Sequence, residues 1–148
     1  MIFHGDIMSK IIITGSDAKN VAIAIKHFLK RRISQTFFQS KTDLLILTSN
    51  VHPPFPSCDI LLIPDGLTII PITKTAISYG MSPKSSITLS SLGKKPVLSV
   101  QREIITFKGR IIEPQDIPIQ NSLNLSQYAL MASSAALLIL GIPPERLS

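Results

Sequence analysis

The chain has 148 residues, and 45% of them are hydrophobic, so it can bury one ordinary core and is not a disordered tail. It carries a formal net charge of +6 and one cysteine, Cys58, which excludes an internal disulfide. Its most apolar stretch, Ala129 to Leu140, is shorter than the roughly 20 residues of a membrane-spanning helix. We expect one cytoplasmic α/β domain over residues 1–148, with residues 1–8 as a disordered start and no membrane partner.

The apolar pattern in the first half of the chain predicts several strands and one helix. A short β-branched run at residues 10–14 predicts a buried strand that ends at Gly15, followed by a loop and a helix to about Arg32. Apolar residues share one face of that helix, namely Val21, Ala24, Ile25, Phe28 and Leu29. Further apolar runs at 42–48, 58–64 and 75–79 predict buried strands, so we expect a mainly parallel sheet with flanking helices.

The second half of the chain has a different pattern of polar and apolar residues. Polar and apolar residues alternate at 86–90, 99–101 and 105–108, which predicts a small antiparallel sheet within residues 85–112. Turns are expected at 93–96 and 108–110, and an exposed loop at 113–116. A last helix is predicted over 125–140, with Asn124 as its N-cap and Gly141 as its end.

The loop after the first strand is the candidate binding site. Free backbone donors at a helix N-terminus bind phosphates, and a P-loop adds glycines, a lysine and a hydroxyl. Here the lysine is in place, but alanine stands at the second glycine and asparagine at the hydroxyl. The predicted cofactor-binding residues, with ATP as a weak ligand, are Gly15, Ser16, Asp17, Ala18, Lys19 and Asn20.

Several segments together resemble the central ATP-binding domain of the Mur ligases, the cell-wall amino-acid ligases. Residues 11–19 are similar to the family's opening strand and Thr-Gly-Thr-Asn-Gly-Lys-Thr, and residues 45–51 to its later strand ending in Thr-Asn-Val. Residues 76–81 are similar to its Thr-Tyr-Gly segment, and residues 122–147 to the stretch that closes the domain. The segments keep the family's order and cover about half of the chain. The resemblance implies a shortened Mur-ligase-like fold.

The departures from the family bear on activity. The family handles magnesium and phosphates with a P-loop hydroxyl, a glutamate and a histidine after an aspartate. Here Asn20 replaces the hydroxyl, no acidic residue lies between Asn20 and Asp43, and His52 has no aspartate before it. We also expect the family's flanking substrate-binding and C-terminal domains to be missing. Because phosphoryl transfer depends on metal and positioning, we predict no catalytic and no metal-binding residues. The expected function is a binding or regulatory module, linked by the resemblance to cell-wall metabolism, whose partner is a protein or a nucleotide-like ligand.

Other interpretations stay open at this point. An ATP-dependent ligase or nucleotide-binding enzyme would use the degenerate P-loop, with a partner chain completing the site. The cationic residues, Lys26, Lys30–Arg32 and Lys94–Lys95, would suit nucleic acid, but they have no interleaved aromatic residues and are better explained by solubility. We expect Cys58 to be structural, Asp65–Gly66 to be a turn, and the three histidines to bind no metal.

Overall fold

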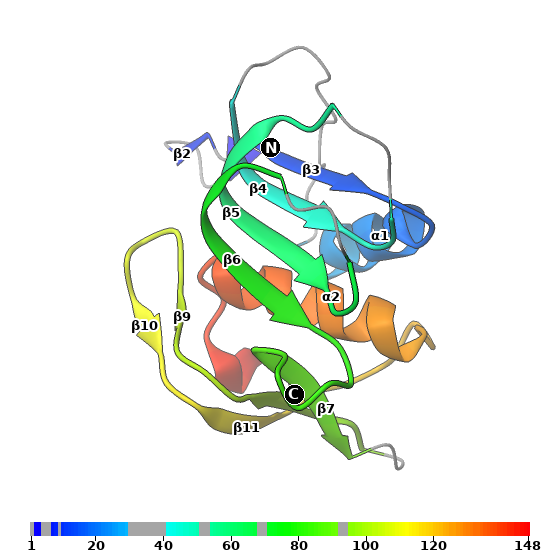
Figure 1. Ribbon diagram of the computed structural model, residues 1–148. Helices are drawn as coiled ribbons and strands as arrows, with labels where there is room; N and C mark the ends of the chain where they lie inside the picture. Colours follow the sequence, from blue (N-terminus) through cyan, green and yellow to red (C-terminus); the bar gives the residue numbers. More distant parts are fainter. Residues whose placement is uncertain are drawn as a thin grey trace.

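A computed structural model of the protein describes residues 2–3, 7–8, 10–29, 41–50, 54–67, 71–91 and 95–148. Their main element is one seven-stranded sheet in the order β11-β8-β7-β6-β5-β4-β3 (Figure 1). Its strands are β3 (Ile11–Thr14), β4 (Lys41–Leu47), β5 (Ser57–Pro64), β6 (Thr73–Tyr79), β7 (Ile87–Ser91), β8 (Val97–Val100) and β11 (Gln115–Pro118). The sheet is mixed and mostly parallel, which confirms the predicted α/β class.

The parallel part runs from β3 to β7, with each strand beside the next one along the chain. The strands predicted at 10–14, 42–48, 58–64 and 75–79 are confirmed to within two residues at either end. Leu44 and Ile46 pack into the core on the helical face, whereas Leu45 and Leu47 pack into a second cluster with Leu61. Burial of both faces explains why these strands read as continuous apolar runs.

The predicted antiparallel sheet is wrong as a separate unit. Strand β7 pairs with β6 through Tyr79 and Ile87, so β7, β8 and β11 extend the main sheet. Within the described part of residues 85–112, β9 (Ile104–Ile105) and β10 (Ile111–Ile112) form a separate ladder, joined by the predicted turn at Gly109. The turn predicted at 93–96 lies partly outside the described residues.

The exposed loop predicted at 113–116 is also wrong in part. Gln115 and Asp116 belong to β11, where they pair with Val100 and Ser99 of β8. Both side chains are nevertheless exposed, and Ile117 is the buried residue of the strand. An edge strand of this kind, which ends on a proline, has too weak an apolar pattern to be recognised.

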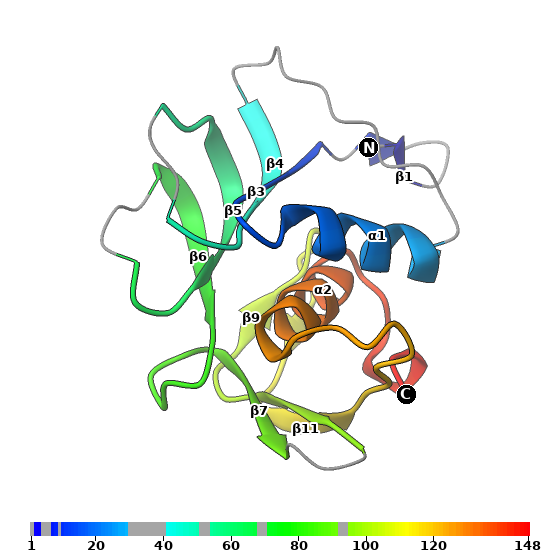
Figure 2. The same ribbon diagram turned by 90° about the vertical axis from the view of Figure 1, so that its right-hand side faces the viewer.

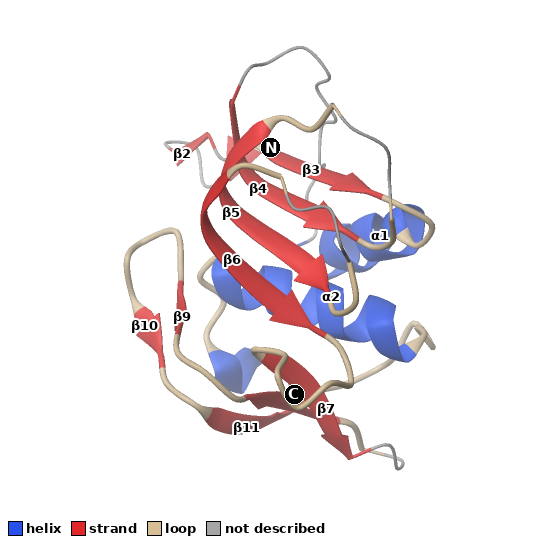
Figure 3. Cartoon of the chain, in the orientation of Figure 1, coloured by secondary structure: helices blue, strands red, loops and turns tan. Residues whose placement is uncertain are grey.

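Two helices lie on the same face of the sheet (Figures 2 and 3). Helix α1 (Ala18–Leu29) contacts β3 and buries Val21, Ala24 and Ile25, as its spacing predicted. Helix α2 (Gln127–Ile139) contacts α1 as well as β5, β6 and β7, and every residue from Ala129 to Ile139 is buried. A short 3-10 helix, η1 (Pro144–Arg146), follows α2. The basic residues 30–32 lie outside the described residues.

The residue that caps α2 differs from the prediction at the amino-terminal end, whereas the carboxyl-terminal end is as predicted. Its N-cap is Ser126, whose hydroxyl accepts a hydrogen bond from the Ala129 amide, and not Asn124. Asn124 has a φ of +54°, in a preceding turn that asparagine tolerates. At the other end Gly141, with a φ of +99°, closes the helix as predicted, because its amide and that of Ile142 donate to Leu138 and Leu137.

The first residues form a short ladder between β1 (Ile2–Phe3) and β2 (Ile7–Met8). Most of the disordered start expected at 1–8 lies outside the described residues, so that expectation stays a prediction. Within the part of the chain that the structure describes, neither helix has the length and apolar character to cross a membrane.

The cap of α2 gives a first prediction. Ser126→Ala should lower the free energy of unfolding by about 1 kcal/mol, because the Ala129 amide loses its acceptor. Asn124→Gly should leave stability unchanged or slightly raised, since glycine adopts the positive φ freely. Urea denaturation of both variants checks this. Equal losses would show that Ser126 does not cap the helix.

Candidate functional site

The carboxyl ends of β3, β4, β5 and β6 meet at one edge of the sheet (Figure 1). This edge brings together the Gly15 loop, Thr48 with Ser49, Asp65, and Gly80. In parallel sheets such edges are the usual place for ligands. The described residues of three segments that carry the family resemblance, at 11–19, 45–51 and 76–81, therefore converge here. The edge is the candidate functional site, and below we call it the carboxyl edge.

Gly15 is required by close packing against the next strand. Its φ is +113°, and a Cβ atom there would lie 2.3 Å from the Thr48 hydroxyl oxygen and 2.7 Å from the Ser49 amide nitrogen. Thr48, which directly follows β4, is held beside the end of β3, because its amide and its hydroxyl both donate to the Thr14 carbonyl. Gly15 thus has a structural reason to be present.

The first donors of the loop are already occupied by the protein's own hydroxyls. The Ser16 amide donates to Ser49 Oγ at 2.9 Å, and the Asp17 amide donates to Thr48 Oγ1 at 3.0 Å. The Ala18 amide donates to the Gly15 carbonyl at 3.2 Å. These are the positions from which a P-loop would face phosphates. The amides in the amino-terminal half of the loop therefore already have acceptors within the protein.

The remaining half of the loop is open. Lys19 and Asn20 are exposed in the first turn of α1, where helical amides have no intrahelical acceptor. All six predicted residues, 15–20, lie together, but only Lys19 and Asn20 offer an accessible cation and accessible amides. Asp17 lies at the same mouth, so a negative charge opposes an incoming anion.

Asp65 links the sheet to α2 at this edge. Its Oδ1 accepts a hydrogen bond from the Tyr128 hydroxyl at 2.8 Å, and its Oδ2 accepts from the Ser82 amide at 2.9 Å. The predicted turn at Asp65–Gly66 is confirmed. In addition, the Asp65 carboxylate connects the turn to α2 and to Ser82 through these two hydrogen bonds. Sequence reasoning missed this contact, because Tyr128 is 63 residues away and no local pattern signals it.

Two tyrosines lie side by side beneath the carboxyl edge. The buried Tyr79 hydroxyl donates to the Leu47 carbonyl at 2.7 Å, and the ring centroids of Tyr79 and Tyr128 are 6.1 Å apart. Burial, followed by the charge of Asp17, raises the pKa of Tyr79 above its ordinary value. Burial, followed by the hydrogen bond to Asp65, also raises the pKa of Tyr128. Both phenols are therefore neutral hydrogen-bond donors at neutral pH.

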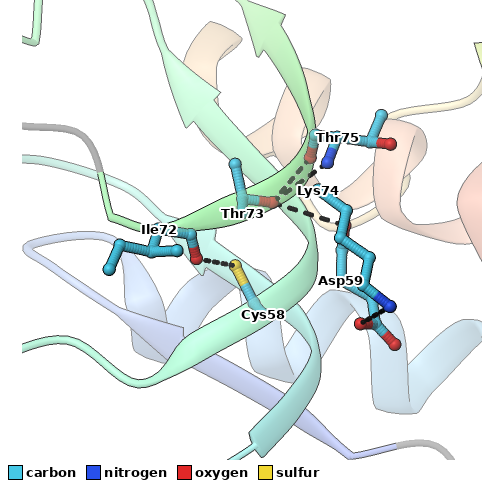
Figure 4. Close-up of polar contacts among 6 residues, drawn as sticks. All are labelled: Cys58, Asp59, Ile72, Thr73, Lys74 and Thr75. Atoms are coloured by element: carbon cyan, nitrogen blue, oxygen red, sulfur yellow. Dashed lines mark hydrogen bonds and ion pairs between the residues drawn. The ribbon is translucent and has the colours of Figure 1, made fainter.

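Cys58 lies near the opposite, amino-terminal ends of the strands (Figure 4). Its thiol donates to the Ile72 carbonyl at 3.9 Å, beside Thr73, and Lys74 pairs with Asp59 at 3.5 Å. Burial is the main cause that raises the pKa of the Cys58 thiol, which disfavours the reactive thiolate. These contacts agree with the structural role predicted for this residue.

The described residues contain no group of three or more metal-ligating side chains. His27 is exposed on α1, whereas His4 and His52 lie outside the described residues. Two hollows at the surface lie elsewhere: a cavity of about 70 Å³ between α1 and α2, and a groove of about 430 Å³ beside β10. Neither of these two is lined by residues 15–20.

No protein-family model, curated protein or solved structure matches the chain. The likeness to the Mur ligases therefore rests on the segments quoted above and enters the proposal below on those residues alone.

The contact between Gly80 and Asp65 can be tested by stability. A Cβ at Gly80 would lie 2.2–2.5 Å from the Asp65 carboxylate, whereas a Cβ at Gly109 would meet no atom within 4 Å. Both glycines have a positive φ, so each alanine variant should lose about 1–2 kcal/mol from backbone strain. Gly80→Ala should lose clearly more. Adding Asp65→Ala to Gly80→Ala should recover part of that excess, and no recovery in a double-mutant cycle would contradict the contact.

The tyrosines predict a pH dependence. Because the fold raises both pKa values, the native state holds phenol protons that the unfolded chain releases near pH 10. The contribution is fully present below about pH 10 and is lost as the pH rises through the folded pKa values. The free energy of unfolding should therefore fall above about pH 10, and less steeply in Tyr128→Phe. The measurement is urea denaturation across this pH range, with absorbance titration of the phenols. If the pKa of Tyr128 were not raised by the fold, the free energy of unfolding would fall equally steeply with pH in the wild type and in Tyr128→Phe.

Proposed function

We propose that the chain is a non-catalytic, Mur-ligase-like binding or regulatory module whose carboxyl edge is a closed remnant of a nucleotide site. The observation that carries the proposal is the pair of hydrogen bonds from the Ser16 and Asp17 amides to Ser49 and Thr48. They join two segments of the resemblance, 31 and 33 residues apart, at one strand edge. They also occupy donors that a bound phosphate would need.

The chemistry of the carboxyl edge supports binding better than turnover. Asp65 has both carboxylate oxygens engaged by Tyr128 and Ser82, so it is not poised as a metal ligand or a general base. Asn20 stands where a P-loop would offer a hydroxyl to magnesium. The link to cell-wall metabolism rests on family resemblance alone.

One feature favours the competing proposal of a nucleotide-binding enzyme. Lys19 is exposed beside two amides of the first helical turn, and a partner chain would have to supply the metal ligands. We therefore expect weak anion binding at Lys19 and Asn20, with a dissociation constant no tighter than about 1 mM, equivalent to about 4 kcal/mol.

The experiment is an NMR titration with ATP and magnesium that follows the amides of residues 15–20. Lys19→Ala should abolish the shifts, whereas Lys26→Ala, an exposed lysine on the same helix, should not. Ser49→Ala should enlarge them, because it frees the Ser16 amide. The isolated chain should hydrolyse no ATP. Magnesium-dependent hydrolysis that is lost in Lys19→Ala would overturn the proposal in favour of the enzyme.

A further inference from the structure

A second surface, remote from the carboxyl edge, has the features of a peptide-binding groove. It has a volume of about 430 Å³, within the usual range of ligand sites, and lies between β10 and the chain that follows α2. Aliphatic residues from two segments line it, namely Ile111 and Ile112 of β10 and Ile142, Pro143 and Pro144 after α2. Figure 1 shows the β9–β10 hairpin standing beside the carboxyl-terminal end of α2.

The groove also carries unpaired charge. Arg110, Glu113 and Glu145 line it, and none of the three forms an ion pair within the described part of the chain. Its lining includes Leu138 and Gly141 at the carboxyl end of α2, which is the negative end of the helix dipole. Two carboxylates against one guanidinium give the groove a negative balance, in a chain whose net charge is +6. The lining therefore complements a cationic group.

The hairpin adds an unpaired strand edge and exposed apolar surface. Among the described residues β10 pairs only with β9, so its other edge is free to accept a strand. Ile111 is 58% exposed, and its cross-strand partner Ile105 is 45% exposed. Exposed aliphatic side chains beside a free strand edge are the elements of recognition by strand addition.

We propose that this groove binds an extended peptide segment of a partner protein, in which a lysine or arginine lies beside aliphatic residues. The peptide main chain runs along the free edge of β10. Its aliphatic side chains contact Ile111 and Pro143–Pro144, and its cation lies near Glu113 and Glu145. The proposal does not depend on the carboxyl edge, since none of these residues lies there.

The probe is a fluorescein-labelled peptide, acetyl-Val-Lys-Ile-Lys-Val-amide, measured by fluorescence anisotropy against the full chain. Its counterpart with glutamate in place of both lysines is the charge control. We expect the lysine peptide to bind, the glutamate peptide to bind at least about tenfold more weakly, and added salt to weaken the binding. Amide shifts on binding should fall at residues 105–115 and 141–145.

Variants locate the site. Glu113→Gln with Glu145→Gln should weaken the lysine peptide about tenfold, and Ile111→Ser should weaken both peptides. The matched controls are Glu103→Gln, an exposed glutamate, and Ile72→Ser, an 83% exposed isoleucine, neither of which lines the groove. All five substituted positions are exposed, so the variants should fold. Absence of binding, equal binding of both peptides, or equal effects of the controls would overturn the proposal.

Discussion

Burial of α2 against the sheet is the constraint on which the rest of the fold depends. Parallel strands usually receive their covering helices from the crossovers between them. Here β4, β5 and β6 are neighbours in sequence and in space, and the described residues between them contain no helix. The apolar side chains that these strands turn towards the helical face are covered by α2, from the far end of the chain. This explains why α2 carries small and aliphatic residues on every side.

The strands and helices that the sequence predicted best are those whose burial is nearly complete. Strands β4 and β5 are recognisable as continuous apolar runs, and the face of α1 is recognisable because its apolar residues repeat with the period of a helix. Prediction failed where pairing depends on distant partners. Nothing local indicates that Ile87 pairs with Tyr79, or that Gln115 and Asp116 pair with β8. The prediction of the N-cap of α2 failed for a different reason. Asn124 and Ser126 are both good capping residues, and only the backbone conformation decides between them.

The candidate site shows the same division between local and long-range information. The position of the Gly15 loop after the first strand was predictable, because a strand, a glycine and a helix follow one another. Whether its donors are free was not, because they are satisfied by Ser49 and Thr48 from the next strand. Hydroxyl side chains carry no pattern that distinguishes a ligand contact from an internal hydrogen bond. The open or closed state of such a loop is therefore a property of the fold.

The narrow junction between β6 and β7 has a consequence for how the molecule opens. The parallel strands join the antiparallel ones through a single paired position, Tyr79 with Ile87, whereas β5 and β6 share six. Because so few backbone bonds cross this junction, it is the place where we expect the sheet to open first. Helix α2 contacts β5, β6 and β7, so it spans the junction and couples the two parts of the sheet. Fraying of this one helix would leave the antiparallel half attached to β6 by the Tyr79–Ile87 pair alone, while the ladders among β3, β4, β5 and β6 stay paired.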